Sequence, residues 1–235
     1  MAISTNPLAW LRSVQPRRAI ALLLLLLPLT VGAQTVRDLW LSMPPSFAPY
    51  LSTSLRTQCL DFYDMHTDAQ TDNALKGKSR IDTLTSTFLA ATLSKAHTLQ
   101  MKLLPASGSG LGSSLGSGSS SSLSSCDSVL CVVSSWDGPK RDSEVQLFDR
   151  QWKPLQAPLT FSADSFVCRP DTMSEERFSR LVALLDPIMF SVSLSPAENV
   201  LLVKLSPVVP NPEDEKAIEQ ILVQRKLKWD GKTFK

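Results

Sequence analysis

The chain has 235 residues, of which 43% are hydrophobic, enough to form the core of one ordinary domain or of two small ones. Its formal net charge is +2, but the first 33 residues hold three arginines and no acid, so the remaining 202 carry 21 basic and 22 acidic side chains. This nearly neutral balance, without a basic block, argues against nucleic acid or an anionic membrane as the main partner.

The N-terminal residues have the pattern of a secretory signal peptide. Three arginines precede an apolar run over 19–31, and the small pair Gly32-Ala33 follows it. The run is shorter than the roughly 20 residues of a spanning helix and is interrupted by Pro28, so a retained membrane anchor is the weaker interpretation. We expect cleavage between Ala33 and Gln34, export to the periplasm or the outer-membrane surface, and no transmembrane segment after cleavage.

Two helices and three strands are predicted in the first half of the mature chain. A short helix over 35–42 stops before Pro44-Pro45, and a second helical region over 47–66 has apolar residues at four-residue spacing. Strands follow over 80–85, 87–94 and 98–104. In the last of these, apolar residues alternate with polar ones that include Lys102, which predicts one buried and one wet face.

The strongest strand signal is the apolar, β-branched run over 128–136, which we expect at the centre of a sheet with a neighbouring strand on each side. It is followed by the turn residues 137–139 and a strand over 144–148. Before it, residues 107–125 are almost entirely Ser and Gly, which predicts a disordered low-complexity insert within a single domain over 34–235.

The C-terminal part predicts an edge strand over 159–168 and a helix opened by a capping box of Thr172 and Glu175. A hairpin of 188–194 and 200–205 follows, then a helix from Asn211 to near Arg225 and Lys226, then a small hairpin around 230–231. The order of elements predicts an α+β fold with a mostly antiparallel sheet and helices packed on one face. A weak echo of helix followed by strands in each half suggests a duplicated unit.

Four cysteines, Cys59, Cys126, Cys131 and Cys168, would allow up to two disulfides in an exported chain. A bridge between Cys126 and Cys131 is discounted, because five strand residues separate their Cα atoms by roughly 16 Å. Cys59 continues an apolar helix stripe, so a buried thiol is favoured there. The pairing of the others stays open.

Signals for catalysis or metal binding are weak. The sequence Gly112-Ser113-Ser114-Leu115-Gly116 fits G-x-S-x-G, but it lies in the Ser/Gly tract without the strand and helix that this motif needs. His97 is expected at the surface, in a turn.

Acidic residues and one histidine gather at the end of the second helix, but without a known metal spacing, so we predict no catalytic, cofactor or metal site. These residues are Asp61, Asp64, His66, Asp68 and Asp72. Four tryptophans, Trp40, Trp136, Trp152 and Trp229, are candidates either for core packing or for a ligand-binding face.

Several short sequences resemble an uncharacterised family of secreted Bacteroidales proteins, a domain of unknown function. The resemblance covers nearly the whole mature chain except the Ser/Gly tract, and it implies a periplasmic or outer-surface location without any assigned activity. It rests on Pro49-Tyr50-Leu51, Leu60-Asp61-Phe62, Gly77-Lys78-Ser79, Met101-Lys102-Leu103-Leu104-Pro105, Asp149 with Trp152, Leu184-Leu185-Asp186-Pro187, Leu227-Lys228-Trp229 and Gly231-Lys232-Thr233-Phe234.

Three short sequences resemble the O-glycosylation motif of exported proteins in that group, which is Asp, then Ser or Thr, then an aliphatic residue. They make Thr83, Ser128 and Thr172 candidate glycan carriers. For Ser128, at the head of the predicted central strand, access is in doubt.

The sequence therefore favours a secreted, non-enzymatic cell-envelope protein that binds another envelope protein or a surface glycan through one face of its sheet. The alternative is a carboxylate-dependent periplasmic hydrolase, for which Asp61, Asp64 and Asp149 are the first candidates. The ligand, the oligomeric state and the membrane leaflet are left open.

Overall fold

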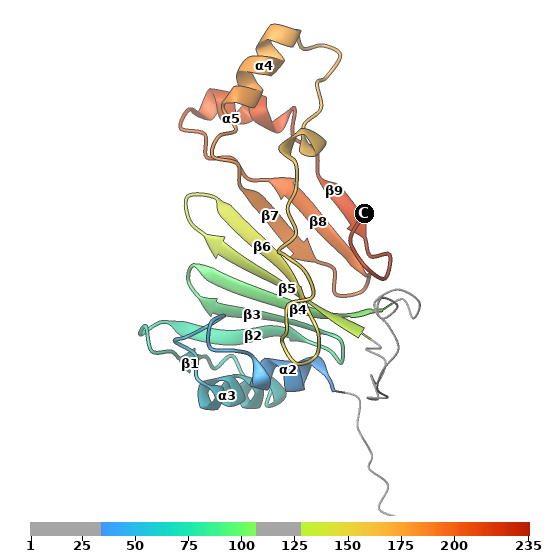
Figure 1. Cartoon of the computed structure of the whole chain (residues 1–235). Helices are drawn as coiled ribbons and strands as arrows, with labels where there is room; N and C mark the ends of the chain where they lie inside the picture. Colours follow the sequence, from blue (N-terminus) through green and yellow to red (C-terminus); the bar gives the residue numbers. More distant parts are fainter. Residues whose placement is uncertain (1–33, 107–127) are drawn as a thin grey trace, which may run out of the picture. The chain divides into compact units, whose positions relative to one another are not determined.

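The computed structural model describes residues 34–106 and 128–235, which belong to one compact unit (Figure 1). The predicted signal peptide, the G-x-S-x-G sequence and Cys126 lie outside the described residues. No helix of the described residues is long and apolar enough to cross a membrane.

A six-stranded antiparallel sheet forms the centre of this unit. Its strands follow chain order and are β1 (Thr71–Asp72), β2 (Lys78–Leu84), β3 (Phe88–Ser94), β4 (His97–Pro105), β5 (Ser128–Asp137) and β6 (Arg141–Phe148). The three strands predicted before the Ser/Gly tract are confirmed as β2, β3 and β4. The run over 128–136 is β5, which pairs with β4 and β6 as expected for a strand inside a sheet.

Helices α2 (Val36–Ser42) and α3 (Thr53–Asp64) cover one face of this sheet, along β1 to β4 (Figure 1). Trp40 of α2 is fully buried, in a core that includes Leu89, Met101 and Leu130 of the strands. The Ser52 hydroxyl caps α3, so this helix begins six residues after Phe47, where the apolar spacing had placed its start. The preceding residues form turns instead.

A second sheet of three antiparallel strands packs on the other face. It contains β7 (Phe190–Leu194), β8 (Val200–Leu205) and β9 (Arg225–Lys228), and β7 contacts β4, β5 and β6. Successive side chains of β5 point to opposite faces of the sheet, so Val133 faces the second sheet and Val132 faces the helices.

At the outer edge of β7, backbone amides donate to side chains of the larger sheet rather than to another strand. The amide of Phe190 donates to Asp142 Oδ1 at 3.3 Å. The amide of Val192 donates to Ser143 Oγ at 3.1 Å, and that of Leu194 to Gln100 Oε1 at 2.8 Å. These bonds cover an edge that would otherwise be open to pairing with another chain.

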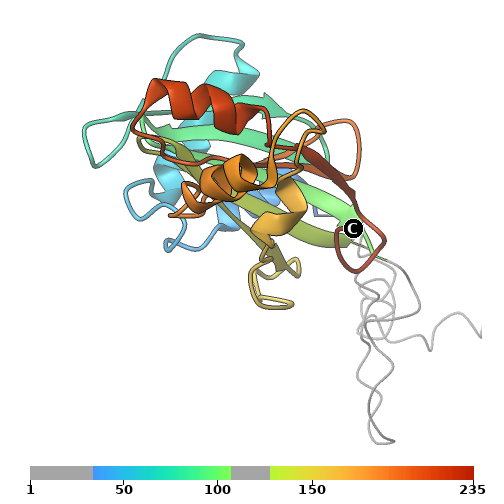
Figure 2. The same cartoon turned by 90° about the horizontal axis from the view of Figure 1, so that it is seen from above.

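Two helices, α4 (Glu175–Ala183) and α5 (Pro212–Glu219), lie side by side beyond the second sheet (Figure 2). The Ser174 hydroxyl caps α4, so the capping box predicted from Thr172 is wrong by two positions. Asn211 caps α5 as predicted, accepting from the Glu213 amide at 3.0 Å.

Two other predictions are wrong in this region. The edge strand over 159–168 is absent from the described residues there, which hold the 3-10 helix η2 (Ala163–Phe166), and only Val167 forms an isolated bridge, to Leu222. Helix α5 ends at Glu219, and Arg225 and Lys226 begin β9 instead. Pairing with β8 outweighs the match between these basic residues and a helix end.

The α+β class with antiparallel strands is confirmed. The strands divide between two sheets, and the second sheet occupies the face that α2 and α3 leave free. This packing overturns the expectation that Lys102 is wet, because the turn between β7 and β8 covers it and leaves it 2% exposed.

Candidate functional site

Three side chains from distant parts of the sequence meet at one end of the larger sheet, and we call them the aromatic patch: Tyr50, His97 and Trp136. His97 begins β4, and Trp136 lies opposite it near the end of β5, so the two share a face of the sheet. Their rings stack with centroids 5.2 Å apart and planes 13° apart. The hydroxyl of Tyr50 and Nδ1 of His97 form a hydrogen bond of 2.8 Å.

The patch combines a buried polar layer with an exposed ring. His97 is 7% exposed, whereas Trp136 is 43% exposed. Burial lowers the pKa of His97, so its neutral form is favoured. Burial raises the pKa of Tyr50, which keeps the phenol protonated as a hydrogen-bonding group. Nε2 of His97 is buried without a hydrogen-bond partner among the described residues.

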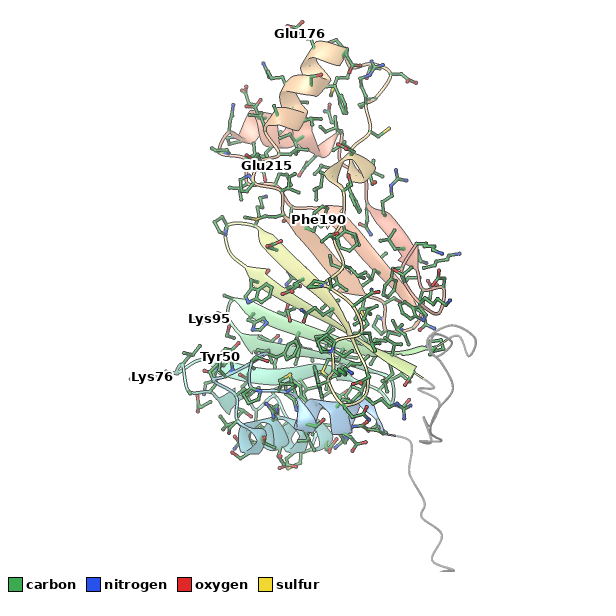
Figure 3. All side chains as sticks on the ribbon, viewed as in Figure 1. Tyr50, Lys76, Lys95, Glu176, Phe190 and Glu215 are labelled. Carbon is green, nitrogen blue, oxygen red and sulfur yellow. The ribbon has the colours of Figure 1, made fainter. Side chains whose placement is uncertain are left out.

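The patch lies where three hairpins turn. The β1–β2, β3–β4 and β5–β6 turns share this end of the antiparallel sheet, and Figure 3 shows Tyr50, Lys76 and Lys95 there. The segment carrying Tyr50 is tied to the first turn, since its carbonyl accepts from the Ala74 amide at 3.0 Å. Backbone contacts therefore hold the patch in place.

A polar side chain of β6 lies beside Trp136 on the same face of the sheet. Glu144 of β6 lies opposite Ser134, two residues before Trp136 in β5, so Glu144 shares the face of the indole. Glu144 is exposed and Gln146, two residues on, is half-buried. A carboxylate beside a fixed indole can hydrogen-bond to a ligand that lies on the ring.

The other three candidate tryptophans pack inside the described structure. Trp40 is buried, and its Nε1 donates to the Arg56 carbonyl. Trp152 packs against Phe47 and Phe148. Trp229 is half-buried and packs on Phe234, and its Nε1 donates to the carbonyl of Pro105 at 2.7 Å.

The prediction that His97 lies at the surface is wrong. Its place in a tight turn suggested exposure, but it is already the first residue of β4 and lies under Trp136. The register between β4 and β5 was the missing information, because it alone makes His97 and Trp136 neighbours.

The acidic residues predicted to gather at the end of the second helix do not form one site, because two of them pair with basic side chains. Asp64 receives two hydrogen bonds from Arg37, at 2.6 and 2.7 Å, and Asp72 pairs with Lys78. Asp61 is exposed on α3.

His66 and Asp68 line a polar hollow of about 350 Å³ between the end of α3 and β2. There Arg80 is paired with Asp82 at 2.6 Å, so the pair is neutral. In the described part of the chain, no three His, Cys, Asp or Glu side chains are placed to hold a metal ion.

The structure gives the hydrolase candidates other roles. The pairing with Arg37 lowers the pKa of Asp64. Asp149 shapes a turn, because its Oδ1 accepts from the amides of Gln151 and Lys153 at 2.8 and 2.9 Å.

Cysteines 59, 131 and 168 are free thiols in the described structure. Burial raises the pKa of Cys59 and of Cys131, which makes both poor nucleophiles. Cys168 is exposed.

The three candidate glycan carriers differ in access. Thr172 is exposed in the turn before α4, and Thr83 is half-buried in β2. Ser128 is 8% exposed and accepts a hydrogen bond from Arg150 Nε at 3.0 Å. Of these three positions, Thr172 has the access that a glycan needs.

The chain belongs to a family described as protein of unknown function (DUF3256), whose model matches residues 28–111 and 121–234. This confirms the resemblance to an uncharacterised family. Among solved structures, the chain is similar to a domain of an uncharacterized protein from Porphyromonas gingivalis W83. The TM-score is 0.61 with 21% identity, over 86% of this chain and 99% of that one, and at this identity the likeness shows the fold alone. No curated protein matches the chain.

Proposed function

We propose that the protein is a secreted, non-enzymatic envelope protein that binds a surface glycan through the aromatic patch. The observation that carries this proposal is the exposed indole of Trp136, stacked on a buried His97 that Tyr50 holds. The predicted signal peptide supports the location.

The chemistry of the patch fits a sugar. A sugar ring presents C–H groups on one face and hydroxyls around its edge. The first can lie on the indole face, and the second can bond to Glu144 on the same face. Because the stack with His97 fixes the ring of Trp136, little side-chain freedom is lost when the ligand binds.

A binding assay with matched variants tests the proposal. The probe is polysaccharide extracted from the envelope of the producing bacterium, immobilised and titrated with the protein. We expect Trp136→Ala to weaken binding at least tenfold, because it removes the ring that the sugar contacts. Leu155→Ala is the control, since Leu155 is 42% exposed, like Trp136, but lies outside the patch.

Two results would contradict the glycan proposal. One is equal binding by the wild type and the Trp136 variant. The other is a wild-type protein that ignores the polysaccharide and is instead recovered in a stoichiometric complex with an envelope protein. N-terminal sequencing of the exported protein tests the location separately, and the expected first residue is Gln34.

A further inference from the structure

A second hollow lies beside α5, distinct from the aromatic patch. It has a volume of about 300 Å³ and lies between the end of β8, residues 206–209 and α5. Four of its lining residues are aliphatic: Leu205, Val209, Ile218 and Leu222. Leu205 and Ile218 are buried, and the other two are half-buried. The volume is at the lower limit for a small-molecule site and suits one aliphatic side chain.

Four charged side chains also line this hollow, and two of them neutralise each other. Lys140 Nζ lies 2.5 Å from Glu215 Oε1, which ties the β5–β6 turn to α5 (Figure 3 labels Glu215). The other two are Lys204 of β8 and Glu219 at the end of α5. Both are exposed, and neither has an ion-pair or hydrogen-bond partner for its charged group among the described residues. The hollow therefore offers one unpaired cation, one unpaired anion and an aliphatic floor.

We infer that this hollow binds an apolar α-amino acid as the zwitterion. The carboxylate pairs with Lys204, the ammonium pairs with Glu219, and the side chain covers Ile218 and its neighbours. A ligand with only a carboxylate would leave Glu219 unpaired beside it, and a ligand with only an ammonium would leave Lys204 unpaired. A residue inside a peptide has neither charge, so the arrangement selects a free amino acid.

Saturation-transfer NMR on the full chain tests this inference with three probes that share the branched side chain of leucine. L-leucine carries both charges, 4-methylpentanoate lacks the ammonium, and 3-methylbutylamine lacks the carboxylate. We expect saturable binding of L-leucine, and at least tenfold weaker binding of each single-charge analogue. Equal binding of leucine and 4-methylpentanoate, or no saturable signal with leucine, would overturn the inference.

Charge-removing variants locate the site. Lys204→Gln and Glu219→Gln should each weaken leucine binding at least tenfold, and circular dichroism should show an unchanged fold because both side chains are exposed. Lys228→Gln and Glu176→Gln are the matched controls. They remove exposed charges from β9 and α4, outside the lining of the hollow, and should bind leucine like the wild type. Wild-type affinity in both lining variants would place leucine elsewhere and refute the assignment.

Discussion

Lys102 joins the two sheets, and its replacement by methionine should destabilise the protein. Its Nζ donates to the backbone carbonyls of Ser195, Pro196 and Glu198, at 2.6, 3.1 and 2.7 Å. These three residues form the turn between β7 and β8. Lys102→Met keeps a similar side-chain length and removes all three donors.

The expected loss in the free energy of unfolding follows from those three bonds. A hydrogen bond from a charged donor contributes about 1.5–3 kcal/mol. Against this, burial leaves the ammonium of Lys102 partly dehydrated and lowers its pKa, and methionine avoids that cost. Water can also reach some of the freed carbonyls at a turn. We therefore expect a net loss of about 3 kcal/mol, or roughly 6–12 °C in Tm for a domain of this size.

Calorimetry and guanidinium unfolding measure this loss. Lys228→Met is the control, because Lys228 is also a strand lysine but is exposed, and its replacement should change stability by less than about 0.5 kcal/mol. Hydrogen exchange should show faster opening of β7 and β8 in the Lys102 variant. A Tm shift no larger than that of the control would refute the view that this ammonium holds the second sheet in place.

Three further predictions concern a buried histidine, an exposed ion pair, and two cysteines that differ in exposure. Burial lowers the pKa of His97, so the unfolded chain binds this proton at higher pH than the folded chain. Wild-type stability should therefore fall as pH drops below about 6.5, and His97→Gln should lack this part of the dependence in unfolding curves at pH 7.5 and 5. Asp64→Asn should leave the urea unfolding midpoint close to that of the wild type, because the Arg37 and Asp64 side chains are 42% and 47% exposed and water screens their attraction; a large fall in the midpoint would contradict this. Under native conditions a thiol reagent should label Cys168 before Cys131, and equal labelling rates by mass spectrometry would disprove the buried position of Cys131.

Local patterns were enough to predict most of the helices and strands. The apolar run of β5, the alternation of β4 and the hairpin of β7 and β8 depend on signals within a few residues, and all three are confirmed. The cap at Asn211 is equally local. Where the pattern was ambiguous, as at Arg225, long-range pairing with β8 decided between helix end and strand.

The predictions for single polar residues were less successful because packing partners determine their environment. Lys102 occupies a polar position of an alternating strand, which normally faces water. Here the turn at 195–198 places three carbonyls over that position. The residues near Lys102 in the sequence give no sign of this contact. The burial of His97 was missed for the same reason. Trp136, which stacks on it, lies 39 residues away in sequence and becomes its neighbour only through strand register. The candidate site therefore could not be assembled from the sequence, although Trp136 was named as a candidate.

The exposed area of Trp136 is the part of the aromatic patch that folding does not use. Stacking of Trp136 on His97 contributes about 0.5–1.5 kcal/mol beyond the burial of apolar area, as for aromatic pairs in general. His97 Nε2 is buried without a partner among the described residues, and such a buried polar atom costs about 1–3 kcal/mol. The buried part of the indole stabilises the fold by apolar contact, whereas the exposed 43% adds nothing to the core. An indole with a large exposed area, on the same sheet face as Glu144, is what a ligand-binding surface requires.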